Sequence, residues 1–312
     1  MKLKTEKSGV LSRKAKIKAS FSRNFYIYLL LLPSLLLIAI FNLAPMKGIL
    51  IAFQDYDIYN PANSDWVWFD NFIKIFKSSD TMLALVNTIT VSFLNLIICF
   101  PAGIIFALLL NEIRCSLFKR SIQTVSYLPH FLSWISVIGI VSTLLSKGGP
   151  VNDFMVWITG NPERQMFLAK QELFLPLVII LNLWKGLGWS SIVYLAAISG
   201  VDETLYEAAA LDGAGKFKQV IHVTIPTILP TAVIMLIWNA GSILNSNFEL
   251  IYGLQNAYIE FEVIGTIMYK NGIMGGDYQM TTAFGLFQSL VNFMILIAVN
   301  EFAKRTADVS VL

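Results

Sequence analysis

The sequence predicts an all-α integral membrane protein with six transmembrane helices. Hydrophobic residues make up 56% of the 312 residues, charged residues only 14%, and the mean hydropathy is +0.65. A soluble domain usually carries about 25% charged residues, because its surface faces water. Here the apolar residues form continuous runs of the length that a bilayer-spanning helix needs, roughly 20 residues. Since these runs do not alternate with period two, they exclude a transmembrane β-barrel.

Six such runs follow one another along the chain, at residues 25–44, 86–110, 122–145, 174–199, 225–244 and 281–303. We expect them to form one transmembrane domain, 25–303, preceded by a basic segment, 1–24, and followed by a short tail, 304–312. No repeat with a period of 20 to 50 residues is visible, which argues against a solenoid.

The charges on the connecting segments orient these spans. Before the first span, eight lysines and arginines accompany a single acid, and further basic residues lie between spans two and three and in the tail. The loops after spans one and five are acidic instead. Because lysine and arginine favour the cytoplasmic side, we expect both termini and the loop 201–224 in the cytoplasm. Segments 146–171 and 246–280 are expected outside, and the cell membrane is the predicted location.

The basic N-terminus admits two other interpretations. It could belong to a cleaved secretory signal peptide, but the apolar run that follows is long and lacks an A-x-A cleavage site. It could bind nucleic acid, but contact with membrane lipid explains the same charges, and we expect no nucleic-acid partner. Cys99 lies inside a span and Cys115 in a cytoplasmic loop, so a structural disulfide is not predicted.

The sequence offers no site for catalysis or for a bound cofactor. The two histidines, His130 and His222, lie on different segments and form no local metal cluster or catalytic triad. The fragment GAGKFK is close to a phosphate-binding loop, but Ala210 and Phe217 replace the required glycine and hydroxyl residue. We therefore expect that this chain is not an enzyme and binds no cofactor. Any energy that drives the function of this chain must then come from a partner protein or from an ion gradient.

Residues 201–224 form a polar loop between spans four and five. Asp202 is a candidate N-cap for a short helix, ETLYEAAALD, and Gly213 can end that helix in a left-handed conformation. A second short helix, KFKQVIHVT, would lead to Pro226 in the first turn of span five. The alanines at 208–210 give the first helix a small-residue surface, around which another protein's groove could close. The alternative is an amphipathic linker that lies on the membrane.

This loop resembles the EAA loop of ABC-importer permeases, whose pattern is E-A-A, three residues, G, nine residues and an apolar-x-apolar-P close. The matching residues are Glu207, Ala208, Ala209, Asp212, Gly213, Ala214 and Pro226. The family's usual isoleucine and leucine are Val223 and Ile225 here, both apolar replacements. The sequence Asp-Gly-Ala after the EAA motif is common in the sugar-transport branch. The resemblance covers essentially the whole chain and is closest to the sugar and oligosaccharide permeases.

The resemblance implies a type I importer permease with the MetI-like fold. The loop would be a coupling helix that docks on a dimer of cytoplasmic ATPase subunits, which bind ATP and magnesium. A second permease subunit, usually a different chain, would pair with this one. An extracellular solute-binding protein would deliver a sugar or oligosaccharide, and it would be a lipoprotein in a host without an outer membrane.

Polar and aromatic residues in spans four and five suggest a path for the substrate. Lys185 lies in the middle of span four, where a charge normally faces a protein interior or a water-filled cavity. Aromatic faces beside amide groups suit sugars, which have apolar CH faces and hydroxylated rims. The candidate residues are Asn182, Trp184, Lys185, Trp189, Trp238, Asn239 and Asn245. The alternative is that Lys185 snorkels or bonds to a neighbouring helix and that the asparagines join helices. Gly186 and Gly188 mark either close helix packing or an unwound turn.

Three functions remain open at this point. The first is a permease subunit of an ABC sugar importer, and the second is the same machine for a non-sugar solute, which shares every motif except the sugar-like Asp-Gly-Ala. The third is an ion-coupled secondary carrier. That carrier would need buried acids as ion sites, and no predicted span has one in its middle.

Overall fold

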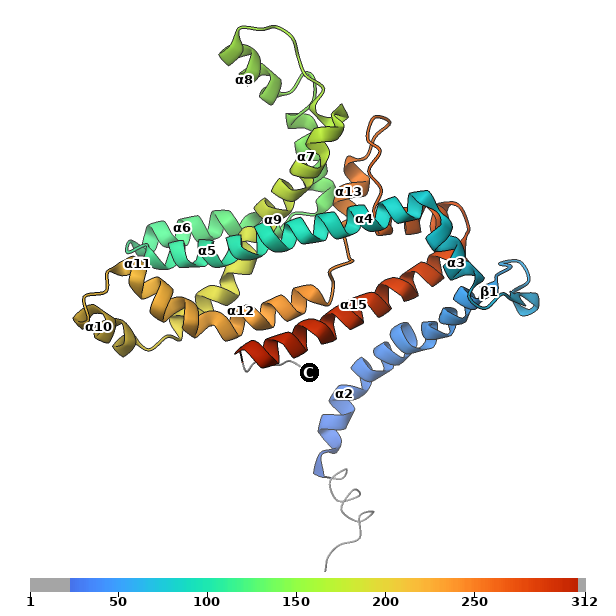
Figure 1. Cartoon of the computed structure of the whole chain (residues 1–312), viewed down its shortest axis with the longest axis horizontal. Coiled ribbons are helices and arrows are strands. Elements are labelled where there is room, and N and C mark those ends of the chain that lie inside the picture. Colours follow the sequence, from blue (N-terminus) through green and yellow to red (C-terminus); the bar gives the residue numbers. More distant parts are fainter. Residues whose placement is uncertain (1–22, 308–312) are drawn as a thin grey trace, which may run out of the picture. The chain divides into compact units, whose positions relative to one another are not determined.

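The computed structural model describes residues 23–307 and is mostly helical (Figure 1). The predicted basic segment 1–24 and the end of the predicted tail therefore lie largely outside the described residues. Contacts divide the described chain between Ile51 and Ala52 into two compact units. The prediction of an all-α protein is confirmed, because the described strands amount to one antiparallel pair, β1 (Gln54–Asp55) and β2 (Asp65–Trp66).

Five helices in the described residues are long and apolar enough to cross a membrane. They are Phe25–Phe53, Ser79–Glu112, Gln171–Ser199, Lys216–Ala240 and Tyr278–Arg305. A sixth candidate is a bent pair of helices, Ser116–Phe131 and Trp134–Leu144. Each predicted span thus has a helical counterpart, and most of these are several residues longer than the apolar run that predicted them.

Three of the spanning helices contain wide π turns. The first span consists of α2 (Phe25–Ile38), a π segment η1 (Ala39–Leu43) and a 3-10 segment η2 (Ala44–Phe53). The second consists of α4 (Ser79–Leu94), a π segment η4 (Asn95–Cys99) and α5 (Phe100–Glu112). Pro45 follows the first π turn and Pro101 follows the second, each two residues after the π segment ends. A proline removes an N–H and crowds the preceding turn, so a local widening accommodates it within a continuous helix.

The third predicted span, 122–145, corresponds to two helices joined by a sharp bend. The helix α6 (Ser116–Tyr127) runs into a 3-10 turn, η5 (Leu128–Phe131), and the chain then turns by 103° into α7 (Trp134–Leu144). Pro129 lies in the 3-10 turn, and Ser133 starts α7 as an N-cap whose Oγ accepts a hydrogen bond from the Ser136 N–H at 3.2 Å. A proline and an N-cap four residues apart end one helix and begin the next.

The helix α9 (Gln171–Ser199) packs closely against α5 and α6. A Cβ atom on Gly188 would lie 2.1 Å from the Ser126 carbonyl oxygen of α6, and one on Gly103 would lie 2.5 Å from the Ser190 Oγ. Small residues of this kind let transmembrane helices approach each other. Because α9 is continuous through this region, Gly188 marks close packing rather than an unwound turn.

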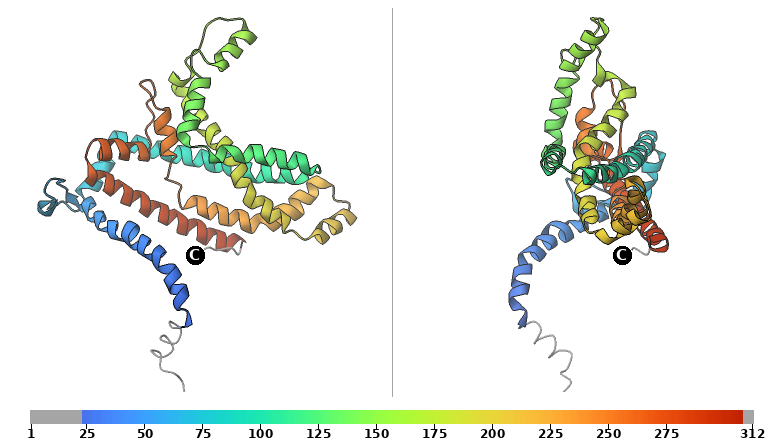
Figure 2. Two further views of the ribbon diagram at one scale, coloured as in Figure 1. Left: turned by 180° about the vertical axis from the view of Figure 1, so that it is seen from behind. Right: turned by 90° about the vertical axis from the view of Figure 1, so that its left-hand side faces the viewer.

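The remaining elements connect or continue the spans. They are η3 (Pro61–Asn63), α3 (Asp70–Lys77), α8 (Pro150–Thr159), η6 (Phe167–Ala169), α10 (Glu203–Leu211), α11 (Lys216–Gln219), η7 (Val220–Thr224), α12 (Ile225–Ala240), α13 (Phe248–Leu254), α14 (Ile264–Ile267), η8 (Met268–Met274) and α15 (Tyr278–Ala307). Figures 1 and 2 agree that α10 and α11 lie at the end of the bundle where α5 passes into α6, opposite α3. The loop 201–224 and the loop after span two therefore share one end, as the charge pattern predicts.

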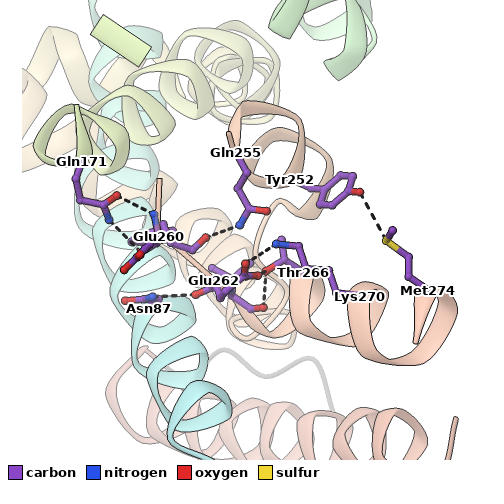
Figure 3. A network of polar contacts seen from close by, with 11 residues as sticks. Asn87, Gln171, Tyr252, Gln255, Glu260, Glu262, Thr266, Lys270 and Met274 are labelled. Carbon is purple, nitrogen blue, oxygen red and sulfur yellow. Dashed lines mark hydrogen bonds and ion pairs between the residues drawn. The ribbon is translucent and has the colours of Figure 1, made fainter. Parts of the chain in front are cut away.

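The segment between α13 and α14 is fixed by polar contacts to three helices (Figure 3). The Gln171 side chain exchanges two hydrogen bonds with the backbone of Glu260, and the Asn87 amide donates to the Glu262 carbonyl at 2.8 Å. The Glu262 carboxylate accepts from Lys270 and from the Thr266 hydroxyl. Backbone groups of a segment without regular structure are in this way satisfied by side chains.

Candidate functional site

The helix α10 begins with a cap, as the sequence predicts. The Asp202 Oδ1 accepts a hydrogen bond from the Thr204 N–H at 2.9 Å, and Glu203 follows in the first turn. The backbone hydrogen bond from Thr204 and, after it, the one from the Thr204 side chain lower the pKa of the Asp202 carboxyl. A carboxylate at this position also interacts favourably with the helix dipole.

Gly213 ends α10 in the left-handed conformation that the sequence predicts. Its φ is +77°, and its N–H donates to the Ala210 carbonyl at 3.0 Å. The Ala214 N–H reaches back to the Ala209 carbonyl at 2.9 Å, so the carbonyls of Ala209 and Ala210 are both satisfied. A Cβ on Gly213 would meet nothing within 4 Å. The position therefore requires glycine because of its backbone angle and not because of crowding.

The second predicted helix of the loop is not a separate element, which corrects that part of the prediction. The residues Lys216–Ala240 form one continuous helix, in which α11 passes through the π turn η7 into α12. Pro226 follows this wide turn instead of starting a new helix. The missing proline N–H and the crowding of the preceding turn explain why the helix is wider there and yet unbroken.

Two side-chain contacts join the loop to the long helix, one from α10 and one from the turn after Gly213. The Tyr206 Oη lies 2.9 Å from the Thr224 Oγ1, and the Gln219 Nε2 donates to the Ala214 carbonyl at 3.1 Å. Tyr206 also packs against the hydrophobic cluster around Tyr194 and Ile198. The loop is thus a rigid elbow, and we use that name for residues 202–224.

The outer surface of the elbow carries apolar side chains that the sequence analysis did not select. Leu211 is 90% exposed and Phe217 is 77% exposed. Glu207 and Ala208 are also exposed, whereas Ala209 is half-buried. Large apolar residues at the tip of a polar loop are typical of a contact surface, and the sequence already shows them there.

Lys185 does not line a cavity in the described chain but holds the break between α6 and α7. Its Nζ donates to the His130 carbonyl at 3.3 Å and lies 4.6 Å from the centre of the Trp134 ring. The His130 ring stacks on Trp189 at 4.2 Å. These contacts match the alternative in which Lys185 bonds to a neighbouring helix, because a carbonyl left unpaired at a helix break needs a donor in the membrane.

A cavity of about 270 Å³ lies between the second span, α9 and α12. Its lining residues are Ser92, Asn95, Leu96, Cys99, Phe100, Gly186, Ser190, Tyr194, Met235, Asn239, Ser242, Ile243 and Asn245. Of the predicted path residues, it contains Asn239 and Asn245. Asn182 lies behind Asn95 in a hydrogen-bonded chain, and Trp184 and Trp238 are exposed on the surface. The sequence analysis missed Asn95 and the serines, which are single polar residues within apolar spans.

Comparisons with known proteins place the chain in a family. Residues 99–308 match the family model described as "Binding-protein-dependent transport system inner membrane component". The chain is 41% identical to the polygalacturonan/rhamnogalacturonan transport system permease protein YteP of Bacillus subtilis over 91% of this chain and 89% of that protein. It is 40% identical to the protein LplB of the same organism, over 92% and 91%.

A solved structure agrees with these matches. The chain resembles a subunit of a bacterial ABC transporter involved in the import of the acidic polysaccharide alginate, with a TM-score of 0.86 and 35% identity over 94% of this chain and 99% of that one. The same transporter is also known in complex with its periplasmic protein bound to an alginate pentasaccharide. On this evidence the chain belongs to the family of inner-membrane components of binding-protein-dependent transport systems and has the type I ABC-importer permease fold.

Proposed function

We propose that this chain is the membrane-spanning subunit of an ATP-driven importer that carries a sugar or oligosaccharide into the cell. The observation that carries the proposal is the elbow, which joins a short capped helix rigidly to a helix that lines the cavity. Motion of α10 is transmitted to α12 through the Tyr206–Thr224 contact and the Gly213 turn. A rigid lever between a docking surface and a cavity is what energy coupling requires.

The elbow is proposed to dock on a dimer of cytoplasmic ATPase subunits, which bind and hydrolyse ATP with magnesium. Leu211 and Phe217 supply exposed apolar contacts, and the small side chains of Ala208 and Ala209 permit close approach. Both termini and the elbow then lie in the cytoplasm. This chain provides the substrate path and transmits the motion of the elbow to it, and the ATPase subunits hydrolyse ATP.

Two further partners complete the proposal. A second permease subunit, a different chain as the resemblance implies, closes the path from the other side. A solute-binding protein delivers the substrate to segments 146–171 and 246–280, and it is a lipoprotein where no outer membrane exists. The similar proteins transport polygalacturonan, rhamnogalacturonan or alginate, which supports an oligosaccharide as the substrate.

An ion-coupled carrier receives no support from the polar groups of the spans. Among the described residues, no aspartate or glutamate is buried, and Glu301 pairs with Arg305 at 2.9 Å on an exposed face. A carrier driven by cations would need such acids in the interior.

The test is reconstitution of the complete transporter, with both permeases, the ATPase and the binding protein, in proteoliposomes. We expect sugar-stimulated ATP hydrolysis and uptake of labelled oligosaccharide that stops when ATP is withheld. Uptake driven by an ion gradient without ATP would overturn the proposal in favour of a secondary carrier. If an amino acid or a phosphonate stimulates ATP hydrolysis and no sugar does, the chain is still an importer subunit, but the proposal of a sugar substrate is wrong.

A further inference from the structure

The cavity between the second span, α9 and α12 has polar walls without charge. None of its lining residues is an aspartate, glutamate, lysine, arginine or histidine. Its polar groups are the hydroxyls of Ser92, Ser190, Ser242 and Tyr194 and the amides of Asn95, Asn239 and Asn245. An amide can present either an oxygen acceptor or an NH₂ donor, so its orientation decides which ligand groups it can bind.

A chain of hydrogen bonds that starts at a backbone amide fixes the orientation of Asn95. The Leu250 N–H can only donate, so the atom of Asn247 that it meets at 3.3 Å is the Oδ1. The Asn247 Nδ2 therefore donates to the Asn182 Oδ1 at 2.9 Å. The Asn182 Nδ2 in turn donates to the Asn95 Oδ1 at 3.4 Å. This sequence of donors leaves the Asn95 NH₂ group as the part of that amide that can serve a ligand.

A second and separate chain fixes Asn245. The Gln288 Nε2 donates to the Leu244 carbonyl at 2.9 Å, which can only accept, and the same nitrogen donates to the Asn245 Oδ1 at 2.7 Å. The Leu244 N–H donates to the Asn292 Oδ1 at 3.1 Å, so the Asn292 Nδ2 is also directed to the Asn245 Oδ1, at 3.5 Å. Both neighbours donate to the Asn245 Oδ1, so the Asn245 NH₂ group is the part of this amide that can bind a ligand.

Two locked amides thus offer hydrogen-bond donors to the same cavity. Within the part of the chain that the structure describes, neither the Asn95 Nδ2 nor the Asn245 Nδ2 donates to another protein group. The ligand group that suits fixed donors is one that only accepts. A carboxylate has two such oxygens, whereas every sugar hydroxyl brings a proton that also needs an acceptor.

We propose that this cavity recognises the carboxylate of an acidic sugar unit through the NH₂ groups of Asn95 and Asn245. The inference rests on the proposed function, since it requires that the sugar passes this chain. Hydrogen bonds to an ionised acceptor are stronger than neutral ones, and no acid in the lining repels the substrate. No cation in the lining forms an ion pair with it either, and a passage site must release what it binds.

In this arrangement Asn182 is a positioning residue and not a contact residue. Both ends of its amide are occupied by Asn247 and Asn95, so it sets the direction of the Asn95 amide. Removing Asn182 lets Asn95 rotate and present its oxygen to the carboxylate.

The test uses the complete reconstituted transporter with its binding protein and two labelled probes, trigalacturonate and its neutral trimethyl ester. We expect wild-type uptake of trigalacturonate and a loss of at least about tenfold in Asn95→Asp and in Asn245→Asp, because each variant places a negative acceptor against the carboxylate. Asn63→Asp, an exposed change far along the chain from the cavity lining, is the matched control and should leave uptake unchanged.

A second comparison isolates the positioning role. Asn182→Leu should raise the KM for trigalacturonate with little change in kcat, and it should add nothing in an Asn95→Ala background, where no amide remains to be oriented. Co-purification of each variant with the ATPase identifies any that fail to assemble, and for those positions the alanine variant replaces the aspartate one.

Several results would overturn the inference. Wild-type uptake of trigalacturonate by Asn95→Asp and Asn245→Asp would do so, as would equal losses for the acid and the ester. A wild-type complex that carries only the neutral ester would also do so. If no oligosaccharide stimulates the wild-type complex at all, it is the proposed function that fails, and the two failures are therefore distinguishable.

Discussion

The elbow and the cavity are held by hydrogen bonds of different reach. In the elbow, the bonds join residues close in sequence, from Asp202 with Thr204 to Tyr206 with Thr224. Around the cavity, they join residues on different spans, such as Asn95 with Asn182 and Leu244 with Gln288. The hydrogen bonds of the first region form when its own segment folds, whereas those of the second form only after the spans have packed. Changes in the elbow should therefore affect energy coupling, and changes around the cavity should affect selectivity.

The largest expected effect is that of Gly213→Val. A β-branched residue at a φ of +77° is strained by at least about 1–2 kcal/mol, so α10 should leave its angle to the long helix. We expect loss of sugar-stimulated ATP hydrolysis while the spans remain inserted. Gly215→Val is the matched control, because Gly215 has a φ of −68° and open space around it. If sugar stimulates ATP hydrolysis in Gly213→Val as it does in the wild type, the elbow is only a linker.

The docking surface gives the next effect. Ala209→Trp should release the ATPase, because overpacking a closed contact costs roughly 1–3 kcal/mol. Leu211→Ser should weaken the same contact by removing an exposed apolar side chain. Glu207→Ala should do less damage, since an exposed ion pair contributes only about 0–1 kcal/mol. Pull-down of the ATPase with the purified permease pair ranks the three variants, and equal retention by all of them would contradict a docking role.

Lys185 lies outside both regions, at the break between α6 and α7, and its variant should affect stability. Lys185→Met removes the hydrogen bond to the His130 carbonyl and the contact with the Trp134 ring, so we expect a complex that is less stable by about 1–3 kcal/mol and transports more slowly. Lys185→Arg, which can still donate, is the control. Thermal denaturation of the purified complex and uptake are measured together. Unchanged values of both in Lys185→Met would return this lysine to simple snorkelling.

Tyr206→Phe tests whether the elbow is rigid because of one contact. The variant keeps the packing of the ring and loses only the hydrogen bond to Thr224, worth about 1 kcal/mol. We expect fewer substrate molecules transported per ATP hydrolysed, with normal ATPase binding. Thr224→Val should have the same effect, and the double variant should be no worse than either single one. Additive losses would show that the two residues act separately.

The smallest effect concerns the cap of α10 and pH. The pKa of Asp202 is lowered in the folded chain, so its stabilisation of α10 is present above the unfolded-state pKa and is lost as pH falls through the folded-state pKa. Hydrogen exchange of the Thr204 amide should therefore show less protection, after correction for the intrinsic rate, in that acid range. Asp202→Asn keeps the cap and should abolish the pH dependence. The same dependence in that variant would assign it to another group.

The same contrast in reach explains what the sequence could predict. The cap at Asp202, the left-handed Gly213 and the apolar runs depend on local chemistry, and all three are confirmed. The apolar run 122–145 predicted a third span but not its 103° turn after η5, since that angle depends on the helices packed around it. The amide chain through Asn182 could not be predicted, because it needs the relative placement of three segments, η4, α9 and the start of α13. Lys185 was predicted to lie on the substrate path, with a bond to a neighbouring helix as the alternative, and its contacts with His130 and Trp134 match the alternative.

The wide turn η7 (Val220–Thr224) takes up one residue between the elbow and the cavity wall. A π turn holds about one residue more than an α-helical turn, and in a regular α-helix each residue rotates the following chain by about 100°. Because the wider turn contains the extra residue, α10 and the cavity-lining Asn239 of α12 keep the angular relation that a regular helix one residue shorter would give them. Deleting one residue from η7 should therefore close the turn to regular winding with little rotation of α10, whereas deleting one from the regular part of α12 would rotate α10 by about 100° relative to Asn239. The wide turn is then a place where this helix can change length without changing the orientation of the cytoplasmic contact.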